Sequence, residues 1–77
     1  SRTLYLGNLR EVKTSDLRDK LDKKYGGIIE IEIRRDIKRP SFQYAFIQFS
    51  DIHSVIKAMR CMNGKCIGTS YIKLGFG

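Results

Sequence analysis

The stretch FQYAFIQF, residues 42–49, carries four aromatic side chains in eight positions. In a β-strand, successive side chains point to opposite faces of the sheet, so this stretch divides into two sets. One set holds three aromatic rings and the other is mainly aliphatic: Phe42, Tyr44 and Phe46 against Ala45, Ile47 and Phe49. Because a strand buried on both faces needs cover on both sides, the rest of the chain decides which face belongs to the core.

The length of the chain limits how much cover it can supply. At 77 residues, only about 60% of the surface of the unfolded chain can be buried, which allows a single two-layer core. No apolar run approaches the ~20 residues of a membrane span, and we expect no membrane partner. Because the chain starts without Met, we expect residues 1–77 to form a single domain of a longer, multidomain protein.

Sequence periodicity predicts six elements. Three further stretches alternate with the period of a strand: residues 3–8, 28–35 and 71–77. Two stretches repeat apolar residues every three or four positions, as one face of a helix does: residues 14–26 and 50–64. The order strand, helix, strand, strand, helix, strand is the split βαβ pattern. It predicts an α+β, ferredoxin-like sandwich, with a four-stranded antiparallel sheet and two helices on one face.

Short polar residues and glycine predict where the helices begin and end. We expect Thr14 or Ser15 to cap the first helix and Gly26 to end it. Ser50 or Asp51 is the expected cap of the second helix.

Helices on one face of the sheet leave its other face to water. The strand residues expected to face the helices are Leu4, Leu6, Ile29, Ile31, Ile33, Ala45, Ile47, Phe49, Ile72, Leu74 and Phe76. They meet one apolar stripe on each helix: Leu17, Leu21 and Tyr25 on the first, and Ile52, Val55, Met59 and Met62 on the second. These residues make a complete core without using the remaining aromatic side chains.

Four aromatic residues then lie on the uncovered face: Tyr5, Phe42, Tyr44 and Phe46. A contiguous exposed apolar patch on a small domain indicates a binding surface. The split βαβ topology places the first and third strands side by side, so we expect Tyr5 to lie beside Tyr44 and Phe46. A flat platform of rings suits single-stranded nucleic acid, because every base has a π-face that can stack on a ring.

The net charge of +7, from 15 Lys and Arg against 8 Asp and Glu, favours a polyanion as partner. Charge alone does not separate nucleic acid from an acidic protein or an anionic membrane. The cations expected around the platform are Arg2, Arg34, Arg35, Lys38, Arg39 and Lys73. Glu30 and Glu32 oppose uniform attraction of phosphate. They either protect the edge of the sheet or accept hydrogen bonds from the exocyclic amino groups of bases.

Residues that could support catalysis or hold a metal do not gather in a suitable pattern. His53 lies off the apolar stripe of the second helix, and we expect it to be solvated. No nucleophile, base and orienting group occur at a catalytic spacing. Cys61 and Cys66 lack the ligand spacing of a zinc site. We therefore expect a protein that is not an enzyme and uses no metal or cofactor.

Two motifs resemble a known family. LYLGNL, residues 4–9, is similar to the RNP hexamer of the RNA recognition motif (RRM) family, and residues 42–49 are similar to its octamer. The octamer pattern K/R-G-F/Y-G/A-F-V-x-F/Y is matched at Tyr44, Ala45, Phe46 and Phe49, with Ile47 in place of Val. The resemblance covers the whole chain, element by element, and implies base stacking by Tyr5, Tyr44 and Phe46.

The octamer departs from the family pattern at its first two positions. Phe42 stands in place of Lys or Arg, and Gln43 in place of Gly. The phosphate-contacting cation of the family therefore has no counterpart at position 42, and Arg39 or Lys38 is expected to supply the charge instead. Phe42 itself either extends the platform or packs against the loop residues Ile37 or Pro40.

Two longer stretches, residues 40–59 and the closing KLGFG of residues 73–77, resemble RRMs of the Spen (split ends) family. The resemblance implies a nuclear protein that binds structured RNA and recruits partners in transcriptional repression or RNA modification.

Two functions remain open for the aromatic face. The first is an RNA-binding module for single-stranded, loop or stem-junction RNA. The second is a protein-interaction module whose aromatic face docks a peptide or a neighbouring domain. The residues expected to bind RNA are Tyr5, Phe42, Tyr44, Phe46, Arg2, Arg34, Lys38, Arg39 and Lys73. We expect a monomeric domain.

Overall fold

The computed structural model describes residues 2–62, 66–67, 70–71 and 73–76. The elements, in chain order, are β1 (Thr3–Leu9), α1 (Thr14–Tyr25), β2 (Ile28–Arg35), β3 (Gln43–Phe49), α2 (Ile52–Met62), β4 (Cys66–Ile67), β5 (Ser70–Tyr71) and β6 (Lys73–Phe76).

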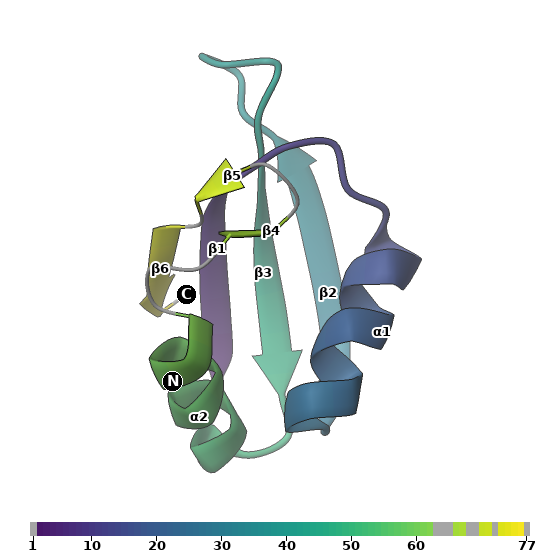
Figure 1. The fold of residues 1–77 in the computed structure, drawn as a ribbon, viewed down its shortest axis with the longest axis vertical. Helices are drawn as coiled ribbons and strands as arrows, with labels where there is room; N and C mark the ends of the chain where they lie inside the picture. Colours follow the sequence, from purple (N-terminus) through teal and green to yellow (C-terminus); the bar gives the residue numbers. More distant parts are fainter. Residues whose placement is uncertain (1, 63–65, 68–69, 72, 77) are drawn as a thin grey trace.

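Four of the strands form an antiparallel sheet in the order β2-β3-β1-β6, with β1 and β3 in its centre. Both helices pack on one face of this sheet (Figure 1). The predicted ferredoxin-like α+β fold is therefore confirmed. Neither described helix is long and apolar enough to cross a membrane.

The core lies between the sheet and the helices. Its buried side chains are Leu4, Leu6, Leu9, Leu17, Leu21, Ala45, Ile47, Phe49, Val55, Ala58 and Met62. The inward assignment of the two central strands is thus confirmed, as is the apolar stripe of α1. On α2 the predicted Val55, Met59 and Met62 contact the core, whereas Ile52 is not among the residues packed there and Ala58, which was not predicted, is buried. Burying a leucine, isoleucine or phenylalanine side chain stabilises the fold by about 1.5–3 kcal/mol, so the inward half of β3 contributes strongly to stability.

Strand β2 departs from the predicted alternation at its start. The predicted inward position of Ile29 is wrong, since this residue is 55% exposed and Ile28 packs against the core instead. The pairing of β2 with β3 shifts register between Ile28 and Glu30. Such a bulge adds one residue to one strand and reverses which neighbour faces inward. Beyond it, Ile31 and Ile33 pack against the core as predicted.

Helix α1 begins one residue earlier than predicted. Its N-cap is Lys13, in extended conformation, and no side-chain capping bond is made there, so the predicted caps Thr14 and Ser15 are wrong. The Leu17 N–H donates to the Lys13 carbonyl over 3.1 Å. The N–H of the preceding Val12 donates to the side-chain Oε1 of Gln43, in β3, over 3.0 Å. This bond holds the segment that leads into the helix.

The other two helix signals are confirmed. Gly26 ends α1 with φ of +66°, a left-handed conformation that favours glycine, and its N–H donates to the Asp22 carbonyl over 2.9 Å. At the start of α2, the carboxylate of Asp51 accepts a hydrogen bond from the His53 N–H over 2.8 Å. Asp51, of the two candidates, is therefore the cap.

The predicted single strand over residues 71–77 is wrong in its first part. Tyr71 pairs with Cys66 in a separate two-stranded sheet, β4-β5, so its backbone groups are directed to β4 and not to β1. Only β6 joins the main sheet, where Leu74 is opposite Leu6. Ile72, and the side chains of Leu74 and Phe76, lie outside the described part of the structure.

Candidate nucleic-acid interface

Three aromatic rings meet on the face of the sheet that the helices leave open. Tyr5 comes from β1, and Tyr44 and Phe46 come from β3; we call them the ring cluster. Their centroids are 6.3 Å apart for Tyr5 and Tyr44, 5.5 Å for Tyr5 and Phe46, and 5.8 Å for Tyr44 and Phe46. Each residue is only half-buried. The antiparallel register, which opposes Tyr5 to Phe46, explains why the rings gather.

Two glycines lie next to the ring of Tyr5, and one of them makes room for it. A Cβ atom placed on Gly7 would lie 2.6 Å from the Tyr5 hydroxyl oxygen, closer than real Cβ atoms come to another heavy atom. Gly75 is opposite Tyr5 in β6, and a Cβ atom there would be 3.7 Å from the ring, an ordinary van der Waals distance. The position of the Tyr5 ring therefore depends on Gly7 having no side chain.

Gly7→Ala is expected to move the Tyr5 ring out of the ring cluster while the fold persists. The added methyl group collides with the end of a side chain, which can rotate away, and alanine is favoured over glycine in a strand by roughly 0.5–1 kcal/mol. NMR cross-peaks between the Tyr5 ring and Phe46 would check this. Gly75→Ala is the matched control and should preserve these cross-peaks; their persistence in both variants would contradict the prediction.

Phe42 precedes β3, and its ring is half-buried. It does not pack on Ile37, which is 94% exposed. The guanidinium carbons of Arg10 and Arg39 each lie 4.4 Å from the centre of the Phe42 ring. Cation–π contacts at exposed sites contribute about 0.5–1 kcal/mol each. The ring is thus covered by cationic groups, an arrangement that neither sequence interpretation anticipated.

Arg39 is held by further contacts. One of its terminal nitrogens donates to the Asn8 Oδ1 over 2.5 Å, and its Nε lies 3.6 Å from the Asp36 Oδ2. Asn8 has φ of +59° at the register shift in β1, which turns its side chain toward the loop of residues 36–42. The main chain of Phe42 closes this loop, because its N–H donates to the Arg39 carbonyl over 2.8 Å.

The two arginines at the end of β2 have acidic partners. Arg34 pairs with Glu32 over 2.6 Å on the exposed surface, and the hydrogen bond and charge of Glu32 raise the pKa of Arg34. Arg35 pairs with Glu11 over 2.9 Å and donates to the Pro40 carbonyl over 2.6 Å. Exposed pairs contribute only about 0–1 kcal/mol, so a polyanion can displace the carboxylates at small cost.

The remaining predicted cations are Lys38, Arg2 and Lys73. Lys38 is exposed in the 36–42 loop, and no described carboxylate lies within 4 Å of its ammonium group. Arg2 is exposed beside the start of β1, and its carbonyl accepts a hydrogen bond from the Phe49 N–H over 2.8 Å. Lys73 is opposite Gly7 in the sheet, and its side chain lies outside the described part.

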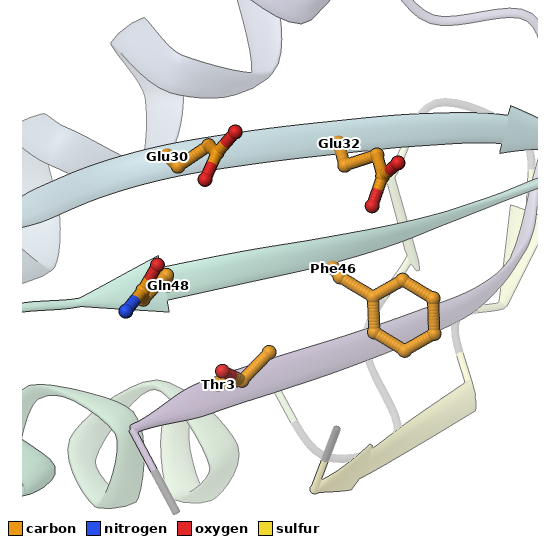
Figure 2. A pocket seen from close by; sticks show the side chains of 5 residues that line it. All are labelled: Thr3, Glu30, Glu32, Phe46 and Gln48. Carbon is orange, nitrogen blue, oxygen red and sulfur yellow. The ribbon is translucent and has the colours of Figure 1, made fainter.

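Two carboxylates, from Glu30 and Glu32 of β2, lie next to Phe46 of the ring cluster. A cavity of about 150 Å³ opens on the sheet surface (Figure 2), and it is lined by Thr3, Glu30, Glu32, Phe46 and Gln48. The β2 side of Phe46 is therefore acidic, whereas the 36–42 loop is basic. Both interpretations of the glutamates keep support, because β2 is an edge strand and the cavity adjoins a ring.

Arg10 was missed by reasoning from the sequence. It follows the end of β1 directly and is exposed. Its place next to the hexamer was the only available signal, because nothing in the local sequence indicates that it reaches Phe42, 32 positions later.

The sequence pattern of the RNA recognition motif family matches residues 4–73. The chain, with its helix-covered sheet and its ring cluster in the two RNP motifs, therefore belongs to the RNA recognition motif family.

Comparison with individual proteins confirms the predicted resemblance to Spen proteins. The whole chain is 47% identical to part of Protein split ends of Drosophila melanogaster and 44% identical to part of the Msx2-interacting protein of Homo sapiens. It spans about 1% and 2% of the lengths of these proteins.

Solved structures agree with the fold. The RRM of Rna15 with bound RNA (GU) has a TM-score of 0.81 and 29% identity, over 100% of this chain and 83% of that one. The first two RRM domains of the yeast poly(U)-binding protein Pub1 give a TM-score of 0.86 and 28% identity, over 99% of this chain and 46% of that one.

Proposed function

We propose that the domain binds single-stranded or loop RNA by stacking bases on the ring cluster. The observation that carries this proposal is the contact among Tyr5, Tyr44 and Phe46 on an uncovered sheet face. Stacking of a base on an aromatic side chain contributes about 1–3 kcal/mol. The Rna15 RRM, which has a similar fold, was solved with RNA (GU) bound.

In this proposal, cations beside the rings position the phosphates, and hydrogen bonds from backbone and polar edges add modest specificity. The residues assigned to RNA binding are the ring cluster and its surroundings: Tyr5, Tyr44, Phe46, Phe42, Arg2, Arg34, Lys38, Arg39 and Lys73. The loop cations matter most, because Lys38 and Arg39 both lie in residues 36–42, next to the octamer.

An RNA titration followed by NMR tests the proposal. Addition of a short single-stranded RNA should shift backbone signals of β1 and β3 while the exposed positions of α1 and α2 stay unchanged. Shifts confined to the helices, or no shifts at all, would overturn it.

A protein-interaction module is the second candidate. Two apolar residues favour it. Phe42 occupies the octamer position where the family has Lys or Arg, and the side chain of Ile37 is exposed in the adjacent loop. The same titration separates the two candidates, because a domain that docks only a peptide through its rings leaves the sheet signals unshifted by RNA.

The setting of the domain is inferred from the Spen relatives. We infer that residues 1–77 are one monomeric domain of a longer nuclear regulator of transcription or RNA processing, in which adjacent RRMs or protein partners add contacts. Nuclear retention of the full-length protein, followed by microscopy, tests this part independently of RNA binding.

Salt dependence should report the loop cations. For single strands, the logarithm of the binding constant falls with the logarithm of salt by about 0.7 per phosphate neutralised. Replacement of both Lys38 and Arg39 by Ala is expected to flatten this slope by roughly 0.7–1.4. Anisotropy titrations across a salt series measure it.

The control for this change is Lys20→Ala with Lys23→Ala, which removes the same charge from exposed positions of α1. It should lower affinity slightly and keep the slope. Equal slopes in the wild type and the loop variant would remove the 36–42 loop from the RNA contact.

A further inference from the structure

The position of Phe42 raises a chemical question, because the octamer pattern has Lys or Arg there. By strand alternation Phe42 belongs to the same side as Tyr44 and Phe46, at the loop end of the ring cluster. A domain that had simply lost this cation would attract phosphate less strongly at that end. The structure shows instead that cations from elsewhere in the chain have been brought to this ring.

The two guanidinium groups come from different segments. Arg10 follows β1, and Arg39 lies in the 36–42 loop. Since each guanidinium carbon is 4.4 Å from the centre of the Phe42 ring, the two carbons are at most about 9 Å apart. Two like charges at this separation repel each other. An anion that contacts both groups beyond the edge of the ring relieves the repulsion, so the pair is suited to bind one.

The positive charges around the Phe42 ring outnumber the described carboxylates near them. Asp36 lies 3.6 Å from the Nε of Arg39, whereas no described carboxylate lies within 4 Å of Arg10. Lys38 adds a third positive charge in the same loop. This end of the sheet therefore carries an excess of positive charge, even though Arg35 nearby is paired with Glu11.

The geometry of each contact leaves donors available. A guanidinium that stacks on a ring keeps its N–H groups at its edge, where they can bind two phosphate oxygens together. The Asn8 Oδ1 takes one terminal N–H of Arg39. This bond and the ring fix the group in place, which lowers the ordering cost of binding.

We propose that Phe42 is a positioning residue, whose ring holds Arg10 and Arg39 so that their guanidinium groups bind one phosphate of the RNA backbone. Arg10 and Arg39, held by the ring, thereby take the place of the single cation that the octamer pattern has at this position. This inference rests on the proposed function and deepens it, by adding Arg10 to the site and by giving Phe42 a role other than stacking.

Substitution and salt dependence together test the proposal. Arg10→Gln is expected to flatten the salt slope for a short single-stranded RNA by about 0.7, so that the loss of affinity over a tenfold rise in salt is about fivefold smaller. Phe42→Leu should flatten the slope too, although it changes no charge, because the guanidinium groups lose their platform. Phe42→Tyr keeps the ring and should restore the wild-type slope.

A control and a double variant separate positioning from general charge or folding effects. Arg60→Gln removes one exposed charge from α2 and should keep the slope. In the Phe42→Leu background, Arg10→Gln should have much less effect than in the wild type. If Phe42→Leu keeps the wild-type slope, or if the two changes act independently, the positioning role is refuted.

RNA with a single neutral methylphosphonate linkage locates the contact. At one linkage, the substitution should weaken binding to the wild type severalfold and have little effect on Arg10→Gln. Absence of such a linkage overturns this inference alone, provided that the unmodified RNA binds and shifts the sheet signals. Absence of binding by the unmodified RNA overturns the proposed function as well.

Discussion

Phe46→Ala is expected to weaken the binding of single-stranded RNA by about 1–3 kcal/mol and to leave the domain folded. The ring lies on the open face, 5.5 Å from Tyr5 and 5.8 Å from Tyr44, and Phe46 is not among the described residues packed against the buried core. Its removal therefore deletes a stacking surface and leaves the core intact. Tyr44→Ala should have an effect of the same size. Anisotropy titration gives the affinity, and urea denaturation gives the free energy of unfolding.

The matched control removes an exposed apolar side chain from the helix layer. Ile56 lies on α2 and is 36% exposed, so Ile56→Ala should keep the RNA affinity. Unchanged affinity in both Phe46→Ala and Tyr44→Ala would refute stacking on the ring cluster. A loss of affinity in Ile56→Ala of the same size would show that the helix face contributes to binding.

Phe49→Ala, in the same strand, is expected to have the opposite result: a loss of stability of about 3–5 kcal/mol. The Phe49 side chain is fully buried, and its removal leaves a cavity that the small core cannot fill by relaxation. A domain of 77 residues has a total stability on the order of 4–12 kcal/mol, so the expected loss is at least about a quarter of the total.

Urea denaturation of Phe49→Ala and Phe46→Ala side by side measures the contrast. Saturating RNA should recover folded Phe49→Ala protein, because ligand binding to the native state shifts the folding equilibrium. A loss of stability below about 1 kcal/mol for Phe49→Ala would contradict its assignment to the core.

The order of the elements and most of the core could be predicted, because periodicity reports which residues face inward. Alternation in residues 42–49 placed Ala45, Ile47 and Phe49 in the core, and the topology then placed Tyr5 next to Phe46. These inferences need only the period of each element and the rule that two helices cover one face.

The errors arise where tertiary contacts decide between equivalent local choices. Ile28 and Ile29 are the same residue type, and only the bulge against β3 determines which of them faces the core. The N-cap of α1 at Lys13 follows Val12, whose N–H donates a hydrogen bond to Gln43, 31 positions later in β3. Local sequence carries no signal of such a partner.

From the sequence we predicted the rings and Arg39, but neither Arg10 nor the contact of the two arginines with Phe42. The rings lie in regular strands, where position determines direction. Arg10 and Arg39 lie outside the strands, and their approach to Phe42 depends on how two loops fold against each other. Tyr71 shows the same limit, because its pairing with Cys66 competes with the longer strand that alternation suggested.

The opposite charges on the two sides of Phe46 give the open face an electrical direction. A single strand of RNA also has two unlike sides, a line of phosphates and a row of bases. In the proposed complex we expect the strand to lie with its phosphates toward the arginines of the loop end and its base edges toward Glu30 and Glu32. A polyanion without bases, such as a polysulfate, has no group to place over the carboxylates, so we expect it to bind at the loop end.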